Sequence, residues 1–212
     1  MKNKSLPEAI KNELFSNSLD ISIDYTELII DSNLSNEILK DIPLVKSIYA
    51  SAKIVGSIRN FYTTKKILTF LKQFQMGNID SDKLEKFKNE FNENESYSGK
   101  VINLIIQMND RFIDASKSKI FANLFINYIN TNIDWSELIT LIYVLDKIQP
   151  SLFEVMHKYF TSGLVAHNPI ISEIHESLCF SCGIGYRSGT AFWINILGQK
   201  LYAFGIAESF TS

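Results

Sequence analysis

Apolar side chains recur every three or four residues through most of this chain, and this spacing is the feature that most limits its fold. The runs Val101–Phe112 and Ile120–Tyr128 show it most clearly. Residues at this spacing share one side of an α-helix, where they pack against a core. The 212 residues include only four prolines and nine glycines, too few for the many turns of a β architecture. We therefore predict a mainly α-helical protein, with 46 % apolar residues to fill its core.

Residues 42–79 carry six cations and no carboxylate, although the whole chain has a net charge of −2. The cations are Lys46, Lys53, Arg59, Lys65, Lys66 and Lys72. Apolar residues at helical spacing run through Val45–Tyr62, so we predict a basic amphipathic helix that begins at Pro43 and ends at Gly77-Asn78. Helices of this kind bind anionic lipid, nucleic acid or acidic proteins.

Acidic segments flank this basic stretch on both sides. Residues 1–41 contain four lysines and eight acids, and residues 80–99 contain three lysines and six acids. Two interpretations stay open: the flanks neutralise the cations within the monomer, or the cations face an external partner. Within the second flank, the polar run Asn92–Gly99 is predicted as a loop. We divide the chain into an acidic N-terminal segment (1–41), a helical bundle with the basic helix (42–130) and a C-terminal domain (131–212).

Local signals predict helix starts in the C-terminal domain. Asp134 and Glu137 have the spacing of a capping box, and Ser151 and Glu154 repeat that spacing at the start of the next helix. Asn168–Pro169 predicts the start of a further helix, since proline is favoured in a first helical turn.

The pattern changes after Gly183. Strand-like runs at Ile184–Tyr186 and Ala191–Ile194 flank a turn, and Asn195 is placed to cap a final helix. Three helices, a hairpin and a closing helix resemble the element order of a winged-helix domain, over the last third of the chain. Apolar spacing carries this resemblance, and Asn195 stands where many such domains have Thr. The fold class we expect is therefore a helical bundle followed by a winged-helix-like module with one small β-hairpin.

This module does not have the charges of a DNA reader. Helices that read DNA present Arg, Lys, Asn or Gln to bases and cations to phosphates. The predicted helix Pro169–Cys182 carries Glu173 and Glu176 with no Arg or Lys, and Arg187 in the hairpin turn is a nearby cation. We therefore expect a winged helix used for protein contact or dimerisation.

No catalytic constellation is recognisable in the sequence. Cys179 and Cys182 form a CxxC pair with His175 one helical turn upstream, which is a weak pattern for a zinc site. We expect buried thiols instead, because free Cys is among the most buried residue types. We predict a non-enzymatic, cytoplasmic protein with no metal, no cofactor and no small-molecule substrate.

The middle of the chain resembles small all-helical proteins of prophages and other mobile elements. The segments Ile42–Val45, Lys65–Leu71 and Ile133–Leu138 carry the resemblance, which extends to abortive-infection proteins of the Abi-alpha type. It implies a bacterial or phage protein that takes part in phage–host conflict, in phage defence or prophage maintenance. No active-site residues are transferred by it.

These observations lead to one main functional expectation and two alternatives. We expect an interaction protein that binds itself or a protein partner through helices, since Ala52 and Gly56 at positions i and i+4 permit close helix approach. The alternatives are a nucleic-acid-binding regulator and an effector or toxin at a membrane surface. Candidate contact residues for a partner or nucleic acid are Lys46, Lys53, Arg59, Lys65, Lys66, Lys72 and Arg187.

Overall fold

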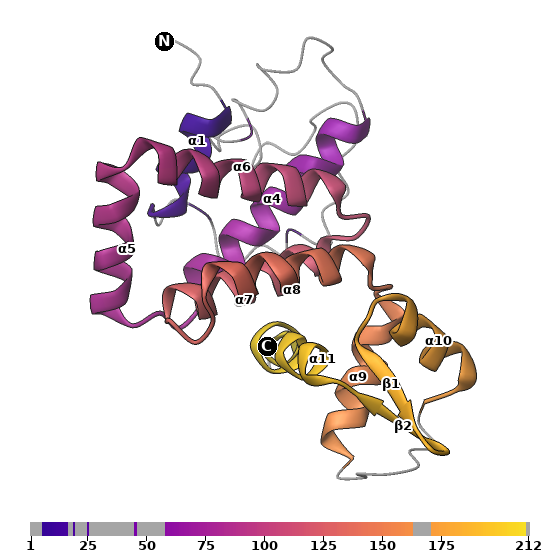
Figure 1. Cartoon of the computed structure of the whole chain (residues 1–212). Coiled ribbons are helices and arrows are strands. Elements are labelled where there is room, and N and C mark those ends of the chain that lie inside the picture. Colours follow the sequence, from indigo (N-terminus) through magenta and orange to yellow (C-terminus); the bar gives the residue numbers. More distant parts are fainter. Residues whose placement is uncertain are drawn as a thin grey trace. The chain divides into compact units, whose positions relative to one another are not determined.

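The computed structural model describes residues 6–16, 19, 25, 45, 58–162 and 171–210, with side chains except at residues 58–61. Helices account for most of these residues, which also contain one two-stranded antiparallel sheet (Figure 1). The predicted mainly α-helical class is confirmed. The chain forms two compact units, Met1–Ser118 and Lys119–Ser212, and the division falls inside a helix.

Four helices form the described part of the first unit. They are α1 (Leu6–Leu14), α4 (Ile58–Met76), α5 (Ser81–Glu93) and α6 (Glu95–Arg111). Both α4 and α5 pack against α6, and α1 packs against α4 and α6 (Figure 1). The core side chains Phe70, Phe91 and Ile105 are fully buried. As the Gly77-Asn78 signal predicted, α4 ends at Met76.

A single residue, Asn94, joins α5 to α6. Its backbone N–H donates to Glu90 O (2.9 Å) at the end of α5, and its side-chain oxygen accepts from Tyr97 N (3.0 Å) in the first turn of α6. The prediction of a loop over Asn92–Gly99 is wrong. The polar composition of that segment indicated a loop, but Asn94 caps both helices, so no longer connection is needed.

The second unit contains most of α7 (Ala115–Ile129) and the elements that follow it. These are α8 (Trp135–Lys147), α9 (Ser151–Thr161), α10 (Glu173–Ser181), β1 (Gly185–Ser188), β2 (Ala191–Ile194) and α11 (Ile196–Leu201). The strands pair with Gly185 opposite Ile194 and Ser188 opposite Ala191, which confirms the predicted hairpin. Its bounds differ from the prediction, because Arg187 lies in β1 opposite Phe192 and not in the turn. Gly189, in the turn, has a φ of 62°, a left-handed conformation that favours glycine.

The capping box at the start of α8 is confirmed. Asp134 Oδ1 accepts from Glu137 N (2.8 Å), and Glu137 Oε2 accepts from Asp134 N (3.1 Å). The second predicted box is wrong, because α9 has Pro150 at its N-cap position with no side-chain cap. Glu154, which was expected to complete that box, forms an ion pair with Lys158 one turn later (2.7 Å).

The start of α10 differs from the prediction as well. The helix begins after Ser172, whose hydroxyl accepts from His175 N (3.4 Å), rather than at Pro169. Ser172 caps the helix because its hydroxyl oxygen accepts from a backbone N–H of the first turn, which has no partner within the helix. Residues 163–170 lie outside the described residues.

Asn195 connects the hairpin to α11, as predicted. Its Oδ1 accepts from the backbone N–H groups of Leu197 (3.1 Å) and Gly198 (3.0 Å). Its Nδ2 donates to Gly183 O (2.9 Å), in the turn that follows α10. One side chain therefore caps α11 and ties that helix start to the end of α10.

After α11 the chain continues as a π-helix, Tyr202–Ile206, and then a short 3₁₀ turn. Two buried asparagines of α7 hold this segment. Asn123 Nδ2 donates to Gly205 O (2.8 Å), and Asn127 Nδ2 donates to Phe204 O (3.0 Å). Gly205 permits this approach, since a Cβ there would lie 2.8 Å from a side-chain atom of α7.

Candidate interaction surfaces

The predicted basic helix is described only in its second half. Several predicted contact residues lie outside the described residues or have side chains that are not described, so their roles stay predictions. They are Lys46, Ala52, Lys53, Gly56 and, for its side chain, Arg59. The remaining cations of the stretch, Lys65, Lys66 and Lys72, lie on α4 in two different surroundings.

Lys66 is buried inside the first unit, with 6 % of its surface exposed. Its Nζ donates to Phe112 O (2.5 Å) and Asp110 O (3.2 Å), at the C-terminal end of α6. The last carbonyls of a helix have no partner within it and lie at the negative end of its dipole, so an ammonium is stabilised there. Thr63, one turn earlier on α4, donates to Asp110 Oδ1 (3.0 Å). The ammonium of Lys66 therefore stabilises the C-terminal end of α6 and does not contribute to an exposed basic surface.

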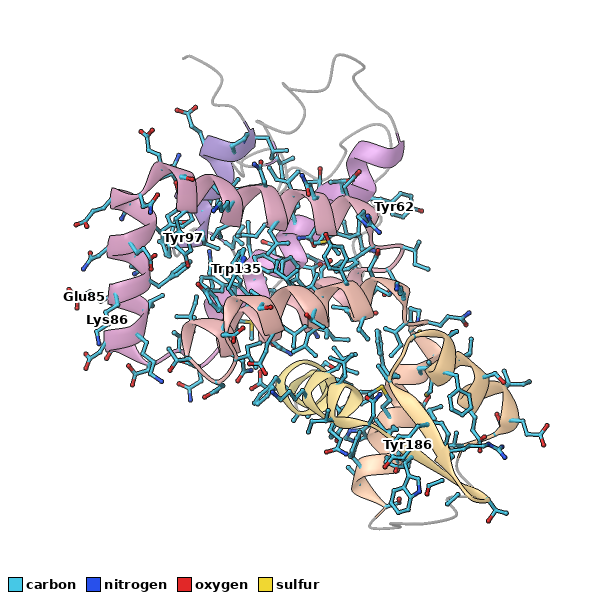
Figure 2. The ribbon with its side chains drawn as sticks, viewed as in Figure 1. Tyr62, Glu85, Lys86, Tyr97, Trp135 and Tyr186 are labelled. Carbon is cyan, nitrogen blue, oxygen red and sulfur yellow. The ribbon has the colours of Figure 1, made fainter. Side chains whose placement is uncertain are left out.

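Lys65 and Lys72 lie on the same helix and are partly exposed. Tyr62, one turn before Lys66, has 60 % of its surface exposed and points away from the helices of the first unit in Figure 2. The described part of the basic stretch thus presents two cations and one aromatic ring. This surface is smaller than the set of six cations suggests.

The surface of α10 and the hairpin exposes large apolar side chains. Ile174 is 72 % exposed, Phe180 42 % and Tyr186 48 %. Tyr186, marked in Figure 2, pairs across the hairpin with the partly exposed Trp193. We call these four residues together the α10–hairpin surface, which has two sides. Phe180 packs edge-on against Phe192, on the hairpin face that α10 covers, whereas Tyr186 and Trp193 lie on the other face. Sequence reasoning did not single them out, although the alternation along β2 places Trp193 on the face opposite the buried Phe192.

The charges close to this surface neutralise one another. Arg187 Nε donates to Glu176 Oε2 (2.9 Å), and Arg187 Nη2 makes a second contact with the same oxygen. The helix α10 carries Glu173 and Glu176 and no Arg or Lys. Binding to a nucleic-acid backbone requires cations that replace condensed counterions. Arg187 is engaged with a carboxylate instead.

Cys179 and Cys182 are buried free thiols, as expected. Burial raises the pKa of Cys179 from 9 to about 12, so its thiol stays protonated at neutral pH. A zinc ligand must lose that proton. His175, the third weak candidate, has its Nδ1 2.9 Å from Ser172 Oγ. Across the described residues, no three His, Cys, Asp or Glu side chains are grouped to hold a metal ion.

Comparisons with known proteins do not identify a family. No protein-family model, no curated protein and no solved structure matches this chain. In the part of the chain that the structure describes, no helix has the length and apolar character needed to cross a membrane.

Proposed function

We propose that this chain is a non-enzymatic interaction protein that binds a second copy of itself through the α10–hairpin surface. One observation carries the proposal: α10 and the hairpin expose aliphatic and aromatic side chains, while the ion pair between them, Arg187–Glu176, is closed within the same chain. Aromatic residues are enriched and charged residues are depleted at the centres of protein–protein interfaces. This composition favours a protein partner over a phosphate backbone.

The charge balance of the surface favours a second copy as that partner. In a two-fold symmetric dimer the same patch of both subunits forms the interface. An unpaired charge in that patch is therefore brought close to the same charge on the other subunit. Arg187 and Glu176 neutralise each other before association. Glu173, at the exposed first turn of α10, is the carboxylate that each copy brings toward the interface. A single acid at the margin is compatible with such a contact, because exposed charges there interact weakly through solvent.

The module that presents this surface is, in our proposal, winged-helix-like. Its support is the order α8, α9, α10, β1, β2 and α11, which is the element order of such a domain. Asn195 caps α11 at the position where many winged helices have Thr. In this arrangement α10 takes the place of the recognition helix and the hairpin takes the place of the wing, and both contact protein.

We propose that this interaction serves phage defence or prophage maintenance, as the resemblance of the middle of the chain to Abi-alpha-type proteins implies. Its support is the similarity of Ile42–Val45, Lys65–Leu71 and Ile133–Leu138 to segments of those proteins. The mainly helical fold of the described residues agrees with an all-helical family. No catalytic role follows from it.

A nucleic-acid-binding regulator is the second candidate. The observation in its favour is the partly exposed pair Lys65 and Lys72 on α4 together with the exposed ring of Tyr62. Cations that follow a backbone and an aromatic ring that stacks on bases are the elements of single-strand binding.

Light scattering on the full chain at several concentrations tests the proposal. We expect a mass that rises from monomer to dimer with concentration, and a monomer for Ile174→Asp, which places a carboxylate on the α10–hairpin surface. The matched control is Ile113→Asp, because Ile113 is also an exposed isoleucine (82 %) but lies in the first unit. It should dimerise like the wild type. Equal masses for all three proteins, or a monomer throughout, would overturn self-association.

Fluorescence anisotropy with labelled single-stranded DNA tests the second candidate. Backbone binding predicts affinity that falls steeply with salt and weakens in the double variant Lys65→Gln with Lys72→Gln. Lys66 is not suitable for this experiment, since it is buried and its replacement would destabilise the first unit. A monomeric chain that binds DNA in this salt-sensitive way would replace the interaction proposal by the nucleic-acid one.

A further inference from the structure

A pocket lies in the first unit, where the end of α1, the end of α4 and the helix α5 meet. Its volume is about 130 Å³, and it is open to solvent on one side. Its apolar lining consists of Leu14, Phe15, Phe74, Ile79 and Leu84. The accessible lining is about equally polar and apolar. Concave sites that combine apolar walls with a few polar groups are the common form of small-molecule sites.

The volume of the pocket limits what it can hold. An engineered apolar cavity of about 150 Å³ binds one benzene molecule. A pocket of about 130 Å³ therefore suits a single ring or a short aliphatic chain. One wall is held in place from behind, because the ring of Phe15 makes edge contacts with Phe87 and Phe91 at centroid distances of 5.9 and 5.3 Å.

Two of the polar groups that line the pocket already have partners within the protein. Gln75 Nε2 donates to Glu13 O (2.8 Å), and Ser16 Oγ donates to Glu13 Oε2 (2.8 Å). Glu13 itself does not line the pocket. These hydrogen bonds leave Gln75 and Ser16 with little capacity to select a ligand.

Lys88 is different, because it lines the pocket and its charge is not neutralised. It lies one turn after Leu84 on α5, with its ammonium 5.4 Å from the centroid of the Phe15 ring. Among the described residues it makes no hydrogen bond and no ion pair. A pocket with apolar side chains in its walls and one ammonium that has no ion pair among the described residues is complementary to a molecule with an apolar group and a single negative charge.

We infer that this pocket binds small monocarboxylates, with the ring or short chain between Phe15, Phe74 and Leu84 and the carboxylate against Lys88. The inference concerns the first unit only and does not depend on self-association through α10. A neutral molecule of the same shape gains the apolar contacts but not the ion pair. A cationic one is repelled by Lys88.

Ligand-observed NMR with the full chain tests this with three probes of similar size: benzoate, benzyl alcohol and benzylamine. We expect benzoate to bind about two- to fivefold more tightly than benzyl alcohol, the range for an ion pair in contact with solvent. Benzylamine should bind most weakly. In Lys88→Gln the advantage of benzoate should disappear, while the matched control Lys86→Gln should keep it. Lys86 is on the same helix and points away from the bundle in Figure 2.

Two further variants separate pocket binding from binding elsewhere. Leu84→Trp fills the pocket and should abolish the signal of all three probes, and circular dichroism shows whether that variant folds. Lys88→Glu reverses the charge without filling the pocket and should reverse the order, with benzylamine above benzoate. The inference is overturned if benzoate has no advantage over benzyl alcohol in the wild type, or if the charge reversal leaves the order unchanged.

Discussion

Replacing Lys66 by methionine removes the buried ammonium while keeping a side chain of similar length. In the native protein this group makes hydrogen bonds with Phe112 O and Asp110 O. A hydrogen bond that involves a charged group contributes about 1.5–3 kcal/mol to stability. Methionine recovers part of this, because it carries no desolvation cost of a buried charge. We expect Lys66→Met to lower the free energy of unfolding by about 2–3 kcal/mol.

The adjacent lysine provides the matched control. Lys65 is partly exposed on the same turn of α4, so Lys65→Met makes the same chemical change without breaking a buried contact. Substitutions of this kind at surface positions change stability by less than about 0.5 kcal/mol. The difference in the free energy of unfolding between the two variants therefore measures how much the buried contacts of the Lys66 ammonium contribute to stability.

Urea titration followed by circular dichroism and by tryptophan fluorescence provides the readout. Both tryptophans, Trp135 and Trp193, lie in the second unit, whereas Lys66 lies in the first. If the two units unfold separately, the loss of stability in Lys66→Met shifts the circular dichroism transition to lower urea concentration and leaves the fluorescence transition unchanged. If Lys66→Met and Lys65→Met lowered the free energy of unfolding equally, the ammonium of Lys66 would not be buried and hydrogen-bonded as described.

The fold leads to four other predictions. Gly99→Ala should raise the free energy of unfolding by about 0.5–1 kcal/mol, because Gly99 lies inside α6 and a Cβ there meets no atom within 4 Å; a loss of stability in the same urea titration would contradict this. Asn123→Leu should cost about 1–3 kcal/mol by leaving the buried carbonyl of Gly205 without its donor, whereas the exposed Asn103→Ala should cost almost nothing. Cys179 should resist iodoacetamide at pH 8 in the native protein and react in urea, because burial raises its pKa to about 12. For the same reason the unfolded chain loses this thiol proton first, so stability should fall as the pH rises from 9 toward 12, less steeply in Cys179→Ala.

Local signals in the sequence predicted those parts of the fold that local interactions determine. The Asp134–Glu137 box and the Asn195 cap are confirmed because each is completed within a few residues of chain. The hairpin is confirmed because its strands are separated by a tight turn containing Gly189. The helical class follows in the same way, from the spacing of apolar residues along α5, α6 and α7.

Long-range contacts determined the features that sequence reasoning missed. Lys66 resembles Lys65 in the sequence, and only the distant end of α6 distinguishes them, 44 and 46 residues away along the chain. Asn94 was missed because its polar neighbours outweighed its capping capacity. The pocket near Lys88 and the exposure of Ile174 depend on how helices pack, so no local pattern marked either of them.

The one-residue joint at Asn94 has a consequence for how this chain tolerates changes in length. An α-helix turns by about 100° per residue, so one inserted residue between Phe91 and Val101 would rotate the stripe containing Val101, Ile105 and Met108 out of the core. A deletion would do the same in the opposite direction. Related chains with the same bundle should therefore vary here by exchange of residues, and gaps in their alignments should fall elsewhere.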